Sequence, residues 1–122
     1  MGTVFATLRG TNVFRSNPGV RAEDGATVMI QNSAASDNGG NGFIANGATR
    51  PVEMTIDSSV AFHNSAAGIF SGPQSTVRIK DNSITNNGSG LVVSGGQILS
   101  FGGNILNGNG TNGAPTSTPG PI

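Results

Sequence analysis

Apolar residues occur along most of the chain in short runs that alternate with polar or small residues. In Val77-x-Ile79 and Leu91-x-Val93 the apolar side chains are two positions apart, the spacing of one face of a β-strand. No segment has the periodicity of an amphipathic helix. Turn-forming pairs such as Asp24-Gly25, Asn46-Gly47 and Gly95-Gly96 separate the runs. The pattern therefore predicts an all-β chain of short strands joined by tight turns.

The short runs belong to an internal repeat. Residues 77–88 and 99–110 align at a constant offset of 22 residues. Six aligned positions carry similar residue types: Val77/Leu99, Ile79/Phe101, Asn82/Asn104, Ile84/Leu106, Asn87/Asn109 and Gly88/Gly110. The same frame extends backward with spacings of 22 to 26 residues, and an extra loop at residues 48–51 accounts for the drift. Fixed spacing of this kind indicates a solenoid in which each repeat is one coil.

A coil of about 22 residues accommodates three short strands, and successive coils pair in parallel. We therefore predict a parallel β-helix of about four to five coils of 22–26 residues. We assign residues 1–111 to this domain, with residues 1–18 as a degenerate first coil, and residues 112–122 to a flexible tail rich in Pro, Gly and Thr. The predicted inward columns are Val28/Met54/Val77/Leu99, Ile30/Ile56/Ile79/Phe101 and Val20/Phe43/Ile69/Leu91. An antiparallel sandwich of hairpins is the alternative.

One column of the repeat consists of asparagine, namely Asn38, Asn64, Asn87 and Asn109. Asparagine tolerates the left-handed backbone conformation that a tight bend requires. Stacked side-chain amides can also donate to one neighbouring coil and accept from another, as in cross-β ladders. We therefore predict a structural asparagine ladder at this bend rather than a functional site.

The segment Asn82-x-Ile84-x-x-Asn87-x-Gly-x-Gly-Leu resembles the repeat of right-handed parallel β-helix proteins, the pectate-lyase-like superfamily fold. That repeat occurs in pectate lyases, polygalacturonases, the periplasmic copper-site maturation protein of nitrous oxide reductase and many bacterial proteins. The resemblance covers about residues 19–110. It implies a right-handed coil, a bacterial source and, by analogy, an extracellular or cell-surface location. It implies no single function, since the same scaffold carries lyases, hydrolases, receptor-binding segments and inert spacers.

The chain offers few groups for chemistry. Asp57, Arg78, Lys80 and Asp81 form the one charged cluster that the repeat places on an outer sheet face, and we take them as a weak candidate binding site. The cluster has too few acids for a calcium-dependent lyase site. His63 is the only histidine and is expected as an exposed bend residue. We assign no catalytic residue, no metal ligand and no cofactor.

Alternation predicts an apolar stripe on the strand that contains the Gly-led repeat position. If Phe43, Ile69 and Leu91 point inward, then Ile44, Phe70 and Val92 point outward and stack on successive coils. Exposed apolar stripes mark partner surfaces. We therefore predict a homo-oligomer whose interface includes Ile44, Phe70 and Val92.

Composition excludes several partners. Six basic and six acidic residues cancel, which argues against binding nucleic acid or an anionic membrane surface. No apolar run is long enough to span a membrane, and residues 1–14 lack the apolar core of a signal peptide. The chain has no cysteine, so disulfides and thiolate metal sites are excluded.

Two functions remain from the sequence. The first is a non-catalytic structural or binding module of a surface protein, which contacts carbohydrate such as a polysaccharide or forms an assembly. The alternative is a fragment of a polysaccharide lyase or glycoside hydrolase that acts on acidic polysaccharide. Convergence of acids and bases in one groove would favour the second, since those reactions need paired carboxylates or a metal with a base.

Overall fold

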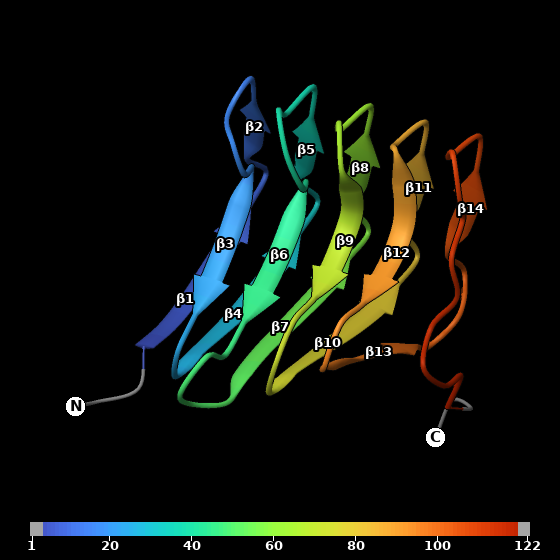
Figure 1. Ribbon diagram of the computed structural model, residues 1–122. Helices are drawn as coiled ribbons and strands as arrows, with labels where there is room; N and C mark the ends of the chain where they lie inside the picture. The colour runs from blue at the N-terminus through green and yellow to red at the C-terminus, as the bar shows by residue number, and fades with distance from the viewer. Residues whose placement is uncertain (1–3, 120–122) are drawn as a thin grey trace.

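A computed structural model describes residues 4–119, and these residues form fourteen strands and no helix. Figure 1 shows the strands as a stack of similar coils, in which each coil follows nearly the same path as the one before it. The strands are β1 (Val4–Arg9), β2 (Asn12–Phe14), β3 (Val20–Glu23), β4 (Ala26–Gln31), β5 (Ala34–Ser36), β6 (Phe43–Asn46), β7 (Val52–Asp57), β8 (Val60–Phe62), β9 (Ala67–Ser71), β10 (Ser75–Lys80), β11 (Ser83–Thr85), β12 (Ser89–Val93), β13 (Gln97–Ser100) and β14 (Ile105–Asn107).

The strands pair in parallel into three sheets that run along the stack. Sheet A has the order β1-β4-β7-β10-β13, sheet B the order β14-β11-β8-β5-β2, and sheet C the order β12-β9-β6-β3. Each of the first four coils contributes one strand to each sheet, and the fifth contributes β13 and β14. The predicted all-β solenoid of parallel coils is confirmed, with about five turns.

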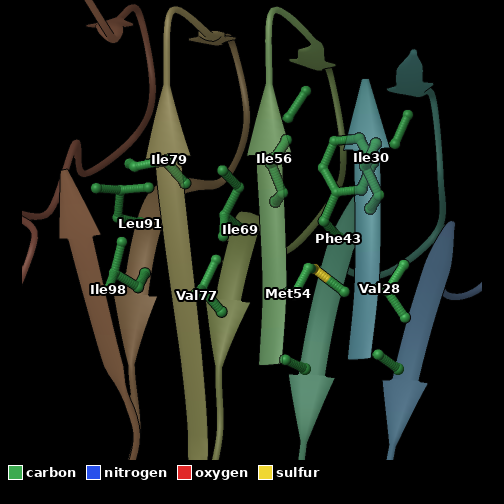
Figure 2. Packing of buried hydrophobic residues seen from close by; sticks show 14 of the residues in the cluster. Val28, Ile30, Phe43, Met54, Ile56, Ile69, Val77, Ile79, Leu91 and Ile98 are labelled. Atoms are coloured by element: carbon green, nitrogen blue, oxygen red, sulfur yellow. The ribbon is translucent and has the colours of Figure 1, made fainter. Parts of the chain in front are cut away.

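The interior is filled by like-on-like columns of apolar side chains. Val28, Met54 and Val77 pair in register, as do Ile30, Ile56 and Ile79, and all six are buried. The facing column from sheet C contains Phe43, Ile69 and Leu91. Figure 2 shows these side chains from sheets A and C pointing toward one another between the strands. Burial of such columns, each side chain contributing about 1.5–3 kcal/mol, ties every coil to its neighbours.

The predicted register is wrong in the fifth coil. Val77 pairs with Ile98 and Ile79 with Ser100, so Leu99 and Phe101 do not continue the two inward columns. Ile98 is the fully buried residue instead. The strand residues of the fifth coil pair at an offset of 21, as in Ile79 with Ser100, whereas Asn104 stacks on Asn82 at an offset of 22. The bend after β13 is therefore one residue longer than the bend after β10. Gly102 and Gly103 both adopt positive φ in that longer bend.

Both end segments pair with the neighbouring coil over the residues that the structure describes. The first coil is regular, with Leu8 opposite Ile30 and Val13 opposite Ala35. The segment predicted as a flexible tail from residue 112 follows the last coil over the part that the structure describes. Leu91 N donates to Asn112 O at 3.0 Å, and Ser100 N donates to Ser117 O at 3.0 Å. The outermost residues of both predicted segments, 1–3 and 120–122, lie outside the described residues.

The left-handed residues of the bend are not the ladder asparagines. Asp37, His63 and Asn86 have φ of 53°, 56° and 57°, and each directly precedes a ladder asparagine. In the fifth coil Gly108 takes the same place with φ of 70°. The prediction that asparagine itself adopts the left-handed conformation is therefore wrong, because the preceding residue makes the turn and the asparagine makes the hydrogen bonds.

Candidate functional site

The outer face of sheet A carries a shallow depression of about 240 Å³. Thr55, Asp57, Arg78, Ile79, Lys80 and Phe101 line it. Strand alternation explains the set, because Thr55 and Arg78 occupy one outward column while Asp57 and Lys80 occupy the next. Three of the four residues predicted as a weak binding site therefore lie together at this depression, and Asp81 adjoins it through Lys80.

Both cations at the depression already have carboxylate partners. Lys80 Nζ lies 3.1 Å from Asp81 Oδ2, and Arg78 Nη1 lies 2.6 Å from Glu53 Oε1. The hydrogen bond to Asp81 raises the pKa of Lys80 above its usual value, and the charges of Asp81 and then Asp57 add to this. Lys80 is opposite Asp57 in register, but its hydrogen bond goes to Asp81.

Phe101 is the residue of this site that the sequence interpretation missed. The constant repeat offset assigned it to the inward column below Ile79, whereas Ser100 occupies that position and Phe101 lines the outer depression. Consecutive glycines at positions 102 and 103 are the signal that could have revealed the longer bend. The corrected register places an aromatic ring beside Arg78 and Lys80.

A second hollow of about 480 Å³ lies at the corner between sheets C and A. Its lining contains amide and hydroxyl side chains, including Gln74, Ser75 and Gln97. The residues that line it within the described part of the chain are neither charged nor aromatic. It offers hydrogen bonds but no apolar ring face, so the sheet A depression is the stronger candidate for a ligand.

The predicted asparagine ladder is confirmed. Nδ2 of Asn38 donates to Oδ1 of Asn64 at 2.8 Å, Asn64 donates to Asn87 at 2.9 Å, and Asn87 donates to Asn109 at 3.0 Å. Each Oδ1 also accepts the backbone N–H of the ladder residue in the preceding coil. Among the described residues no buried side-chain nitrogen or oxygen lacks a partner. The ladder is thus a satisfied structural network.

The lone histidine sits at the exposed bend, as expected. His63 Nδ1 lies 2.6 Å from Asp37 Oδ1 on the preceding coil, and both side chains are more than half exposed. The His63 ring also contacts the ring of Phe62, with centroids 5.9 Å apart. Nucleophilic catalysis would need a hydroxyl or thiol positioned against this imidazole, and within residues 4–119 the His63 ring contacts Asp37 and Phe62 instead.

The predicted outward stripe is in register but is less exposed than expected. Ile44 lies between Arg21 and Phe70, and Phe70 lies beside Val92. Ile44 is only 7% exposed, and Phe70 and Val92 are half-buried. Self-association through this stripe remains a prediction. Light scattering on the wild type and on Phe70→Asp tests it, and a monomeric wild type at high concentration would contradict it.

More exposed apolar side chains lie on the outer face of sheet B. Val60 and Phe62 of β8 point outward there with 38% and 40% exposure. Phe14 occupies the same outward column as Phe62, two coils away, with Ser36 between them. The sequence interpretation missed this face because each large residue alternates with a small one along the column.

No group of three or more side chains suited to holding a metal ion occurs among residues 4–119. The same part of the chain contains no helix long and apolar enough to cross a membrane. A protein family described as "right handed beta helix region" matches residues 4–118.

The chain belongs to the right-handed β-helix family. The match covers nearly the whole sequence, which agrees with the parallel coils of the structure and with the resemblance recognised in the repeat. No curated protein and no solved structure matches the chain. Family membership supports a pectate-lyase-like repeat domain, and the family match carries no ligand or reaction with it.

Proposed function

We propose that this β-helix is a binding module that holds polysaccharide against the outer face of sheet A without cleaving it. The observation that carries the proposal is the depression in which Phe101 lies beside Arg78, Lys80 and Asp57. A sugar ring presents apolar C–H faces and a rim of hydroxyl groups. The depression supplies a partner for each, since an aromatic ring takes the apolar face and the charged groups exchange hydrogen bonds with the rim.

The shape of the sheet supports an extended ligand. Outward columns repeat at each coil with a spacing of about 4.8 Å, so one strand after another offers side chains at regular steps. The column with Thr55 and Arg78 continues to Met29 in one direction and Leu99 in the other. A linear polymer of similar units suits such a surface better than a compact small molecule does.

The local charges favour a neutral polysaccharide over an acidic one. Arg78 and Lys80 are the cations of the cluster, and Glu53, Asp57 and Asp81 provide three carboxylates around them. A uronate polymer would have to compete with these carboxylates for both cations. Neutral hydroxyl groups can donate to the carboxylates and accept from the cations without that cost.

Affinity electrophoresis on a panel of neutral and acidic polysaccharides tests the proposal. We expect retardation by at least one neutral polymer, and a loss of about tenfold in affinity for Phe101→Ala, the scale of removing one ring contact. Phe62→Ala is the matched control because Phe62 is an exposed phenylalanine on the outer face of sheet B, a different sheet from the one that carries the depression. Equal loss in both variants, or no binding to any polymer, would contradict the proposal.

The same samples test for catalysis. We expect no cleavage of pectin, polygalacturonate or alginate with or without added calcium. Turnover that disappears in Asp57→Ala or Asp81→Ala would replace the binding module by the lyase or hydrolase alternative.

A further inference from the structure

Seven Asn-Gly pairs occur in the chain, and their positions in the coil stack give them different hydrogen bonding. The asparagines are Asn38, Asn41, Asn46, Asn87, Asn107, Asn109 and Asn112. Asn-Gly is the dipeptide most open to spontaneous deamidation, because glycine leaves its backbone nitrogen unshielded and free to rotate. The seven pairs differ in whether the glycine N–H donates a hydrogen bond to a neighbouring coil.

In five pairs the glycine N–H donates to a carbonyl of a neighbouring coil. Gly39 N reaches Ser16 O at 2.7 Å, and Gly47 N reaches Pro73 O at 2.7 Å. The other three contacts are Gly42 N to Ala67 O at 2.9 Å, Gly88 N to Asn64 O at 3.1 Å and Gly110 N to Asn87 O at 3.0 Å. Each nitrogen must leave its inter-coil hydrogen bond before it can react.

The two remaining pairs belong to the last coil. Gly108 N and Gly113 N make no backbone hydrogen bond to any residue in the range 4–119. The position equivalent to Gly108 in the coil before is Asn86, whose N–H donates to Asn107 O at 3.2 Å. Gly108 is thus at the edge of the stack, where the described chain provides no further coil to accept its N–H.

The side-chain amides of these two pairs also differ. Asn107 is exposed on the outer face of sheet B and makes no side-chain hydrogen bond within the described part of the chain. Asn112 Oδ1 accepts a hydrogen bond from Asn109 Nδ2 at 2.9 Å, which restrains its amide. The ladder residues Asn38, Asn87 and Asn109 have amides held on both sides.

We propose that Asn107 is a site of spontaneous deamidation and isomerisation, that Asn112 is a slower second site, and that coil stacking protects the other five Asn-Gly pairs. In the reaction the backbone nitrogen of Gly108 loses its proton and attacks Asn107 Cγ. The N–Cγ bond closes a succinimide ring while the bond from Cγ to the amide nitrogen breaks, and that nitrogen leaves as ammonia with the released proton. Water then opens the ring at either carbonyl, giving aspartate or isoaspartate.

The product places a new carboxylate at the end of the outward column that contains Phe62 and Thr85. Asn107 is at the edge of sheet B and points outward, so the added charge stays in water and the fold tolerates it. Isoaspartate lengthens the backbone at a bend beyond which residues 4–119 place no further strand of sheet B. The modification therefore accumulates on folded protein.

The experiment is peptide mapping by mass spectrometry of the full-length wild type, incubated in mildly alkaline buffer, with isoaspartate scored separately. We expect Asn107 to convert at least about tenfold faster than any of the five engaged pairs, because those nitrogens react only through local opening. In denaturant all seven should convert at similar rates. This arm shows that the differences come from the fold.

An Asn107→Ser variant should shift the leading site to Asn112 and leave the other five unchanged. Conversion of Asn38 or Asn87 at the rate of Asn107 in folded protein would overturn the proposal. So would an Asn107 that reacts in denaturant but stays intact in the folded chain. The polysaccharide experiment has no influence on either result, because the two sites lie on different sheets.

Discussion

The two bends that flank sheet B link successive coils through different side chains. At the bend from sheet B to sheet C the stacked residues are Asn38, Asn64, Asn87 and Asn109. At the bend from sheet A to sheet B the column changes along the stack, with Thr11, Ser33, Ser59, Asn82 and Asn104. In both columns a side-chain oxygen accepts the backbone N–H of the equivalent residue in the preceding coil.

The difference lies in what the side chain donates. Asn64 Nδ2 donates backward to Ala35 O at 3.0 Å and forward to Asn87 Oδ1 at 2.9 Å, so one amide links three coils. Ser59 Oγ donates to Asp57 O of its own coil at 2.9 Å, so one hydroxyl links only two coils. The B-to-C bend is therefore a continuous chain of amides, whereas the A-to-B bend becomes one only at Asn82 and Asn104.

Among the variants that test this difference, Asn87→Ala should lower the free energy of unfolding the most. Asn87 is 3% exposed, and its amide makes contacts with Asn64, Ala61 and Asn109. Its removal takes the shared acceptor away from the backbone N–H and the Nδ2 of the buried Asn64, and it takes one donor away from the Ala61 carbonyl. We expect a loss of about 1–3 kcal/mol in the free energy of unfolding, near the upper end because several groups lose partners at once. Denaturant titration measures it.

Ser89→Ala is the control for that variant. Ser89 is two residues away on the same coil, and its side chain makes no hydrogen bond with the described residues, so we expect a change within about 0.5 kcal/mol. Equal losses in the two variants would show that the asparagine column is not a ladder in solution.

The contrast between the bends also explains what the sequence could reveal. The B-to-C column was predictable because one residue type recurs at the coil spacing. Ser33 and Ser59 make equivalent backbone contacts to Asn82, but a change of residue type hides the column from any search for identical letters. Physical equivalence in a solenoid thus requires only an oxygen at the right place, which several side chains supply.

Register was predictable only where the bends have constant length. The inward residues of coils two to four were correctly assigned because the bends between sheets A and B keep one length there. One additional residue before Asn104 turned Phe101 outward and thereby hid the aromatic part of the candidate site. An alternating strand converts a shift of one residue into the opposite face, so site residues near a variable bend are the hardest to predict.

Ser59→Ala should have the smaller effect and sharpens the comparison. Ser59 is 2% exposed, and its hydroxyl accepts from Ser33 N at 3.1 Å while donating within its own coil. Alanine removes one acceptor for a buried N–H, and the backbone N–H of residue 59 can still donate to Asn82 Oδ1. We expect a loss of about 1 kcal/mol, the scale of a single unmade hydrogen bond, measured by the same titration.

Ser36→Ala serves as its control, because Ser36 points outward from sheet B and its hydroxyl makes no hydrogen bond within the described residues. A loss for Ser59→Ala as large as that for Asn87→Ala would mean that hydroxyl and amide columns tie the coils equally. In that case the linking of three coils by one amide adds nothing to stability. A loss clearly below that of Asn87→Ala, with Ser36→Ala near zero, would assign the difference to the hydrogen bonds that the amide donates to both neighbouring coils.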